Sequence, residues 1–450
     1  MWQINRALPV AAFNFFTGVV VVAFTCASTA WSDTLARLQP EQLKKTHAAV
    51  TEYQQKRRPV ELATGFRDYR ACLHVHSGLS HDSKSSLDEV IAGAKKANVQ
   101  VLMFNEHPAA SYDYVTDGHQ GIRDGVLLIP GAETNGFLAF PKTSVQRLGF
   151  SSPQEFVDLV KRTGGLIFLS HLEVRFTWSF HQMTGAEIYN SHADATDEWW
   201  LLGSLPKKAV ELASVIEEFP QEVYSAIHDY PKFYLRRFDE LCRMRPHTGV
   251  AANDAHHNIV FTARLGEKGQ VFIEDSSGDK VYTFPPGPVP ELETRSQGKK
   301  AGESIVTLDI DPYPVSLKHV STHLLMNELT SPAVWEALEK GRAYVSFDWI
   351  ADPTGFACLV EDSDGVHGMG DEVLWNEDIR LKVECALPGH IRIVRDGAVV
   401  AEERNHAVAY EVPGPGIYRV EVWLEVAGRR SPGYWRTPST FDPRLSARNS

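Results

Sequence analysis

The segment LHVHSGLSHD, residues 73–82, carries a high density of side chains that bind metal ions. It places His74, His76, His81 and Asp82 directly after a short apolar stretch. Residues i and i+2 of a strand point to the same side, so His74 and His76 would present two imidazoles to one point. Imidazole and carboxylate groups together suit zinc, manganese or iron. The segment therefore predicts part of a metal site.

Other ligand-type residues follow the same plan, because each of them closes or follows a short apolar run. The runs are VQVLMFNEH (99–107), GVLLIPGAE (125–133), GLIFLSH (165–171), GAEIYN (185–190) and TGVAANDAH (248–256). They end in His107, Glu133, His171, Asn190 and the pair Asp254 and His256. A single HxH pair is weak evidence for a metal site. The ordered set of runs, each with a ligand at its end, predicts one.

The elements that must position these residues are predicted to be strands and helices in alternation. Segment 86–98 opens with Ser86 as a helix N-cap and Glu89 three residues later, and segment 151–165 has Ser152 followed by Pro153. Short apolar runs between such helices are typical of buried parallel strands. Carboxyl ends of parallel strands meet at one rim, as in α/β barrels, so the ligands are expected to converge there.

The chain is predicted to have five parts, of which residues 1–30 are the first. Residues 31–65 form a helical lead-in, residues 66–350 form the metal-binding α/β part, and residues 441–450 form a tail. Within the α/β part, 263–305 is expected to be an irregular excursion. Residues 351–440 alternate polar and apolar positions between turns, which predicts a small antiparallel all-β sandwich.

The N-terminus is typical of an export signal. Residues 7–32 contain no charge, and Ser28 to Ala30 offer a small-x-small cleavage site, so we expect cleavage after Ala30 and a secreted or periplasmic protein. The uncharged run is also long enough for an uncleaved membrane anchor. Four cysteines remain beyond this segment, and both a Cys358–Cys385 bridge and free buried thiols are compatible with their spacing.

Composition limits the class of partner. The chain of 450 residues has a formal net charge of −12 with 43% hydrophobic and 23% charged residues, which is ordinary for a globular protein. This charge argues against a surface for long nucleic acid or anionic lipid, and it leaves a small anionic substrate possible in a local basic pocket. Protein partners cannot be inferred from it.

Taken together, the motifs resemble the polymerase-and-histidinol-phosphatase (PHP) family of metal-dependent hydrolases. The resemblance covers about residues 70 to 265, with LHVHSGLSHD, NEHP, GAET, LSH, EIYN and NDAH in the family's order. It implies a distorted (β/α)7 TIM-like barrel with two or three divalent ions at its C-terminal rim. More loosely, the C-terminal part resembles long exported members with a β-sandwich, some of which are described as hydrolases of carboxylic or carbamic esters.

The resemblance also implies how the ligands divide among the ions. One ion would take His74, His76, Glu133 and Asp254, and a second would share Glu133 and take His171, with Asn190 or His192. A third would take His107, His256 and a residue of the first block. Many members carry Asp at position 81, so this residue is His81 or Asp82. Glu106 stands where the family usually has Asp, and orienting His107 or a bound water is the alternative to a role as ligand. Leu172 stands where Pro is often found.

These assignments predict a metal-dependent phosphoesterase in which a metal-activated water attacks the ester. The sequence has no G-x-S-x-G elbow and no P-loop, so a serine nucleophile is not expected. The predicted catalytic residues are Glu133, Asp254, Glu106 and His192, with His81 and His257 as further possible acids. The predicted phosphate-contacting residues are Lys84, Arg175 and Arg264. Carboxyl or carbamate ester hydrolysis and a non-catalytic, metal-stabilised binding protein are the alternatives.

Overall fold

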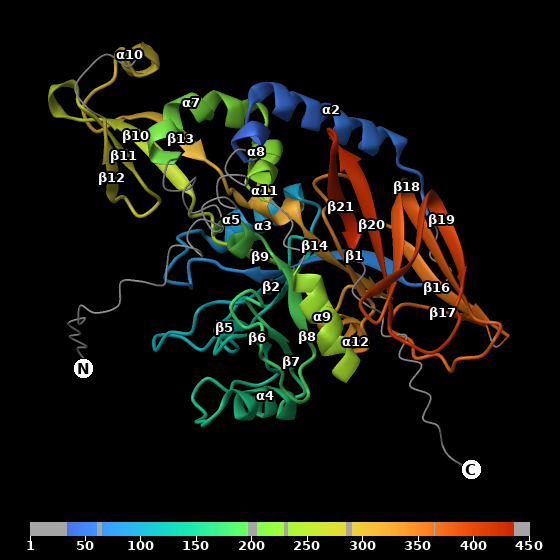
Figure 1. The fold of residues 1–450 in the computed structure, drawn as a ribbon. Helices are drawn as coiled ribbons and strands as arrows, with labels where there is room; N and C mark the ends of the chain where they lie inside the picture. The colour runs from blue at the N-terminus through green and yellow to red at the C-terminus, as the bar shows by residue number, and fades with distance from the viewer. Residues whose placement is uncertain are drawn as a thin grey trace, which may run out of the picture.

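The computed structural model describes residues 34–60, 65–196, 205–228, 233–284, 290–363 and 365–435. The expected signal or anchor segment, residues 1–30, and the expected tail, residues 441–450, lie outside these ranges. Within the described ranges, no helix combines the length and apolar character needed to cross a membrane. Figure 1 shows the course of the chain from the N-terminal helices in blue to the C-terminal strands in red.

Buried parallel strands form the centre of the molecule, as predicted. The strands are β1 (Arg67–Val75), β2 (Val101–Phe104), β4 (Val126–Ile129), β7 (Leu166–Leu169), β8 (Gly185–Asn190) and β9 (Thr248–Ala255). In this sheet β1 lies between β2 and β9, β2 pairs with β4, and β8 lies between β7 and β9, all in parallel. Their side chains are almost all buried on both faces, which explains why the sequence shows continuous apolar runs.

Antiparallel strands interrupt this pattern. Strand β6 (Phe137–Phe140) pairs antiparallel with both β5 (Ala132–Thr134) and β7, while β3 (Gly121–Arg123) pairs antiparallel with β4. Strand β14 (Ser321–Met326) pairs antiparallel with β1 and with β15 (Ala343–Ser346). A single bridge joins Glu106, beyond β2, to Ala132 of β5. The mixed α/β sheet is confirmed, whereas the distorted (β/α)7 TIM-like barrel stays a prediction.

The helices begin where the capping signals predict. The Ser86 hydroxyl accepts the Glu89 N–H at 3.3 Å before α3 (Leu87–Lys96), and the Ser152 hydroxyl accepts the Glu155 N–H at 3.3 Å before α4 (Pro153–Arg162). The remaining helices are α2 (Pro40–Lys56), α5 (Ser191–Thr196), α7 (Leu205–Glu218), α8 (Pro220–Ala226), α9 (Phe233–Met244), α10 (Pro290–Ser296), α11 (Tyr313–His319) and α12 (Ser331–Lys340).

The expected irregular excursion at 263–305 is wrong. The region holds most of a four-stranded antiparallel sheet in the order β12, β11, β10, β13, which projects at the upper left of Figure 1. Its strands are β10 (Val260–Leu265), β11 (Val271–Glu274), β12 (Lys280–Thr283) and β13 (Ser304–Asp309). Only one face is well buried, against helix α7, so the runs are short and partly polar and do not look like the strands of the central sheet.

The C-terminal residues form antiparallel strands, in agreement with the predicted all-β region. They are β16 (Ala357–Asp362), β17 (Gly365–His367), β18 (Arg380–Arg395), β19 (Ala398–Glu411), β20 (Tyr418–Val426) and β21 (Arg429–Trp435). Strand β18 pairs with β16, β19 and β20, and β21 continues the ladder to β15 of the central sheet. Helix α2 runs beside β20 (Figure 1). Cys72, Cys242, Cys358 and Cys385 are buried free thiols in this structure.

A buried ion pair joins the C-terminal strands to helix α9. Arg419 of β20 donates to both carboxylate oxygens of Asp239, at 2.6 and 2.9 Å, and also contacts Glu421. Although burial opposes the charge, the hydrogen bond with Asp239 and the Glu421 carboxylate raise the pKa of Arg419. Two parallel hydrogen bonds between a guanidinium and a carboxylate hold both groups in one geometry. Helix α9 and β20 are therefore fixed relative to one another.

A buried histidine connects β14 to β1 and to the segment after β15. The Nδ1 atom of His323 lies 2.7 Å from Asp68 Oδ1, and its Nε2 atom lies 3.2 Å from Asp348 Oδ1. Burial opposes protonation, but the two carboxylates outweigh it and raise the pKa of His323 to about 9. The imidazolium is thus the form that balances the two buried acids.

We predict that stability depends on the protonation of His323. A raised folded-state pKa means that the contribution is complete below the unfolded value of about 6.5 and is lost as pH rises through about 9. The difference in the free energy of unfolding between wild type and His323→Gln, measured by urea denaturation, should fall over this interval by about 3 kcal/mol at most. The corresponding difference between wild type and His367→Gln, on β17, should stay constant. Equal slopes in wild type and His323→Gln would contradict the prediction.

Candidate metal centre

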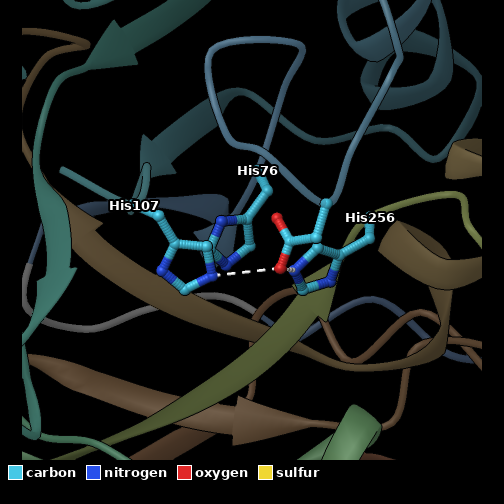
Figure 2. Close-up of side chains that lie close together, drawn as sticks. His76, His107 and His256 are labelled. Carbon is cyan, nitrogen blue, oxygen red and sulfur yellow. Dashed lines mark hydrogen bonds and ion pairs between the residues drawn. The ribbon is translucent and has the colours of Figure 1, made fainter. Parts of the chain in front are cut away.

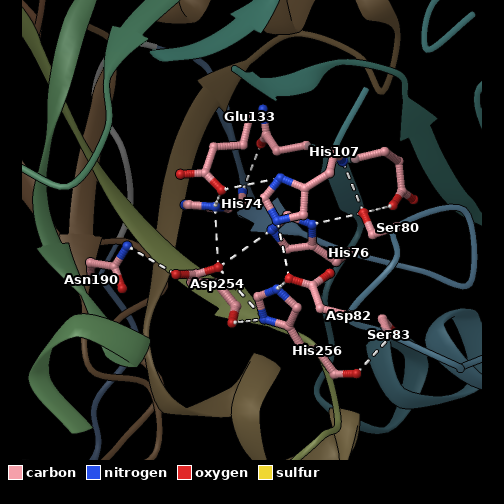
Figure 3. Close-up of polar contacts among 12 residues, drawn as sticks. His74, His76, Ser80, Asp82, Ser83, His107, Glu133, Asn190, Asp254 and His256 are labelled. Carbon is pink, nitrogen blue, oxygen red and sulfur yellow. Dashed lines mark hydrogen bonds and ion pairs between the residues drawn. The ribbon is translucent and has the colours of Figure 1, made fainter. Parts of the chain in front are cut away.

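The ligand-type residues lie at or just beyond the carboxyl ends of the central strands, on one side of the sheet (Figure 3). Three of them, His74, His171 and Asp254, have positive φ angles of 60°, 47° and 48°. Residues with side chains rarely adopt this left-handed conformation, which costs free energy and is concentrated at functional sites. At His74 the strand register shifts between Leu73 and Val75, so a bulge turns this imidazole.

The cluster contains three overlapping groups of ligand atoms, each with all its atoms within 4.8 Å of one another. The groups are His74, Glu133 and His171; His74, His76 and Asp254; and His76, Asp82, His107 and His256. Ligand atoms around one zinc-like ion stand about 2.0–2.2 Å from it, so spacings of this size fit a common ion. The predicted convergence of separate strand ends is therefore present.

Two carboxylates connect the groups. Glu133 Oε1 lies 3.0 Å from His171 Nε2, and Glu133 Oε2 lies 3.2 Å from His74 Nε2. Asp254 Oδ1 lies 3.1 Å from His74 Nε2, and its Oδ2 lies 3.6 Å from His171 Nε2. A neutral imidazole nitrogen has one lone pair and serves one ion, whereas a carboxylate has two oxygens and can serve two. Glu133 and Asp254 therefore have the geometry of bridging ligands.

Asp82 rather than His81 joins the third group. Asp82 Oδ2 lies 3.1 Å from His107 Nε2 and 3.3 Å from His256 Nε2. Figure 2 shows a carboxylate in this position between the rings of His107 and His256, with His76 behind them. The His81 side chain is exposed and stands 4.9 Å, ring centre to ring centre, from His107, outside the groups. The alternative left open by the sequence is decided in favour of Asp82.

The donor set fits a cation. His74 Nε2, His76 Nε2 and Asp82 Oδ1 are buried, and within the described residues no well-aligned hydrogen bond satisfies them, although carboxylate oxygens lie 3.1–3.4 Å from the two imidazole nitrogens. A buried polar atom without a partner costs about 1–3 kcal/mol, so native structures almost always satisfy such atoms. A divalent ion would satisfy all three, and nitrogen and carboxylate donors suit zinc, manganese or iron.

The carboxylates and histidines of the cluster shift one another's pKa values. Burial favours the neutral acid, but the neighbouring His74 ring outweighs it and holds the pKa of Asp254 well below its usual range. Burial opposes protonation of His171, yet Glu133 and Glu173 raise its pKa to about 10. Burial, together with the nearby His256, lowers the pKa of His76 to about 3. Without a metal ion, protonated histidines supply the positive charge that the carboxylates require.

Two glutamates that the sequence interpretation missed orient the ligands. Glu187, fully buried in β8, accepts from His74 Nδ1 at 2.7 Å and from the His171 N–H at 2.7 Å. Glu173 accepts from His171 Nδ1 at 2.8 Å and from the Tyr234 hydroxyl of α9. Carboxylates of this kind fix the tautomer of a metal-binding histidine and raise its basicity. The sequence signal that could have identified Glu187 is its charge, because an acidic residue inside the otherwise buried strand GAEIYN needs a partner.

The sequence leaves two roles open for Glu106, catalysis and the orientation of His107 or a bound water, and its contacts in the structure are those of an orienting residue. Its carboxylate accepts from the Ser77 N–H at 3.1 Å and from the Ser77 and Ser80 hydroxyls, each at 2.6 Å. The Ser80 oxygen in turn lies 3.0 Å from His76 Nδ1 and accepts the His107 N–H at 2.9 Å. Glu106 belongs to none of the three groups, so it acts on His76 and His107 through Ser80.

Two other predicted residues lie at the edge of the cluster. The Asn190 amide nitrogen donates to Asp254 Oδ2 at 3.4 Å and to Glu187 at 3.2 Å, while its oxygen accepts the Ala193 N–H at 2.9 Å. In this orientation Asn190 positions Asp254 and presents no free oxygen to an ion. The His192 ring lies 5.6 Å, centre to centre, from that of His256 and is half-buried beside the site.

The predicted cations are held by other groups. Lys84 donates to the Ser276 carbonyl at 3.2 Å, and Arg264 pairs with Glu274 of the small sheet. In the described ranges, no hydrogen bond or ion pair connects either to a ligand residue. Arg175 donates to the Ser170 carbonyl at 3.0 Å, directly before His171, and lies over the Trp178 ring. The structure therefore does not support a contact of Lys84 or Arg264 with substrate phosphate. Their positions after ligand strands suggested this role, but the sequence did not reveal their partners Ser276 and Glu274.

Comparisons with known proteins give one solved structure to report. No family model matches the chain, and no curated protein matches it. Among solved structures, it is similar to a two-domain protein from Bacteroides vulgatus ATCC 8482 described as containing a predicted PHP-like metal-dependent phosphoesterase, with 14% identity. The match covers 84% of this chain and 97% of that chain, with a TM-score of 0.35.

The choice between Asp82 and His81 can be tested by metal content. We predict that Asp82→Asn lowers the number of zinc or manganese ions per chain, because it removes the carboxylate shared by His107 and His256. The neighbouring variant His81→Gln should retain the wild-type content. Elemental analysis after equilibration with excess ion measures both, and the reverse pattern would contradict the assignment.

Glu106 is predicted to act on metal affinity without being a ligand. Glu106→Gln should weaken binding of zinc by about tenfold to a hundredfold, since groups that orient metal ligands contribute on this scale. The number of ions bound at saturation should stay that of the wild type. Isothermal titration with zinc measures affinity and number together, with Glu336→Gln on the exposed face of α12 as control. A reduced number of ions at saturation would instead identify Glu106 as a ligand.

Proposed function

We propose that this protein is a metal-dependent phosphoesterase of the PHP type that hydrolyses a small phosphomonoester or phosphodiester. The observation that supports the proposal is the set of three overlapping ligand groups bridged by Glu133 and Asp254. Cations held this close together can activate a water molecule near neutral pH and neutralise the oxygens of a phosphoryl group. We also propose that the central strands form a distorted seven-unit barrel and that the protein is exported.

In this proposal, the ligands divide among up to three ions. His74, His76 and Asp254 hold the first, with Glu133 shared between it and a second held by His171. Asp82, His107 and His256 hold the third. The mixture of imidazole and carboxylate donors suits zinc, manganese or iron. Glu187 and Glu173 accept from the Nδ1 atoms of His74 and His171, so the Nε2 atoms of these two rings would be free to bind an ion.

The remaining polar residues around the cluster handle protons and substrate charge. His192, half-buried beside His256, and His81, exposed beside His107, are the proposed acids that protonate the leaving oxygen. His257 is not proposed, because its ring nitrogens lie 2.6 Å from Glu89 and 3.1 Å from Asp309. Arg175, fixed next to His171, is the proposed contact for a phosphate oxygen.

The reaction can be tested on purified protein loaded with manganese or zinc. We predict turnover of p-nitrophenyl phosphate or bis-p-nitrophenyl phosphate, loss with a chelator, and recovery when the ion is restored. Replacing both His74 and His76 by Ala should lower kcat/KM by at least about a thousandfold, because it removes ligands from all three groups. His367→Gln, on β17, should keep wild-type activity.

Two outcomes would contradict the proposal. Absence of turnover with either phosphate ester under zinc, manganese and iron would remove the phosphoesterase activity. Cleavage of naphthyl acetate by the same metal-loaded protein, without phosphatase activity, would assign the site to carboxyl esters. In that case the ion would polarise a carbonyl instead of a phosphoryl group.

A further inference from the structure

A cavity of about 300 Å³ lies where helix α2 meets the C-terminal strands, and none of its lining residues belongs to the metal centre. Tyr53 of α2 forms one side, residues 388–390 of β18 form another, and Trp423 and Glu425 of β20 form a third. Arg404 of β19 and Leu424 of β20 complete the lining. A volume of this size accommodates a small ring-shaped ligand.

The cavity exists because strands β18 and β20 separate at one point. Their register ends with His390 opposite Trp423, and the residues of β18 before His390 have no partner in β20. Pro388 has no N–H to donate to a neighbouring strand, which favours the end of the ladder at this point. Gly389 still lies close to β20, because a Cβ on it would stand 2.6 Å from the Val422 side chain, so a larger residue would intrude on the floor of the cavity.

Tyr53 fixes the wall opposite β18. Its hydroxyl donates to the Glu425 carbonyl at 2.8 Å and accepts the Glu425 N–H at 3.2 Å. Both hydrogen-bonding groups of this backbone position are therefore satisfied by α2. The cavity is held open by covalent geometry and hydrogen bonds of the free protein, so a ligand would meet a preformed site.

The register aligns three functional side chains across neighbouring strands. His390 lies opposite Trp423 on one side and opposite Arg404 on the other, and directly opposed residues of antiparallel strands project from the same face. Two of these side chains are held by glutamates two positions away along the strands. The Trp423 Nε1–H donates to Glu421 at 2.9 Å, which fixes the indole ring, and His390 Nε2 lies 3.1 Å from Glu402.

Two opposite charges in the lining are left for a ligand. In the part of the chain that the structure describes, no hydrogen bond or ion pair reaches the Arg404 guanidinium or the Glu425 carboxylate. A guanidinium offers only donors and an ionised carboxylate offers only acceptors, so together they suit a ligand whose groups both donate and accept. The opposite charges disfavour a ligand that carries net charge.

From these features we propose that the cavity binds a neutral saccharide. Hydroxyl groups of a sugar ring donate to Glu425 and accept from Arg404, while the C–H face of the ring packs on Trp423. A phosphate or carboxylate ligand would face the carboxylates of Glu425, Glu402 and Glu421 as well as Arg404. This site is independent of the proposed phosphoesterase activity.

Binding can be measured by isothermal titration of the whole protein, with and without metal, against neutral gluco-, galacto-, manno- and N-acetylgluco-oligosaccharides. We expect at least one of them to bind, and Arg404→Ala to weaken that binding by about tenfold or more. Arg380→Ala removes an exposed arginine from the other end of strand β18 and should leave binding unchanged. Trp423→Leu, checked for folding by circular dichroism, should also weaken binding.

Three results would overturn the proposal. The first is absence of binding by every oligosaccharide of the panel. The second is equal binding by wild type and Arg404→Ala, which would place the saccharide elsewhere. The third is binding of a zwitterionic amino acid such as glutamine, lost in Arg404→Ala, without binding of any saccharide. Since the readout is heat of binding, the results do not depend on catalytic activity.

Discussion

Four carboxylates that must keep their charge while buried or half-buried are the constraint on which the centre of this molecule depends. Glu133, Glu187 and Asp254 all contact His74, and Asp82 contacts His107. Removing ionised acids from water is costly unless positive charge stands beside them. The chain supplies five imidazoles from four separate segments, and the surrounding sheet keeps these opposite charges together.

The order of the strands explains how segments far apart in sequence meet. Because β2, β1, β9, β8 and β7 are neighbours and run in parallel, the loops after their carboxyl ends lie side by side. Regular strands would not aim the ligands correctly. The left-handed backbone at His74, His171 and Asp254 orients these three side chains toward the cluster. Hydrogen bonds stabilise this strained backbone: Asn105 Oδ1, just beyond β2, accepts the His74 N–H, Glu187 accepts the His171 N–H, and Asn190 donates to Asp254.

Much of this site could be predicted from sequence, because ligand type and strand position are both visible there. Ser86 and Ser152 correctly predicted the starts of helices α3 and α4, and the short apolar runs predicted the parallel strands. The i, i+2 argument placed His74 and His76 together, yet a bulge at His74 rather than regular alternation produces the geometry. What could not be predicted depends on long-range contacts: the antiparallel β6, the one-sided sheet around β10, the Glu274 partner of Arg264, and the path from Glu106 through Ser80.

Helix α9 touches both halves of the molecule through two residues one and a half turns apart. Tyr234 reaches Glu173, which orients His171, while Asp239 is held by Arg419 of strand β20. A gene that ended before the C-terminal strands would leave Asp239 without its counter-charge and β15 without its neighbour β21. Recombination could not exchange this C-terminal module for an unrelated one without rebuilding the helix, so the two halves are expected to be inherited together.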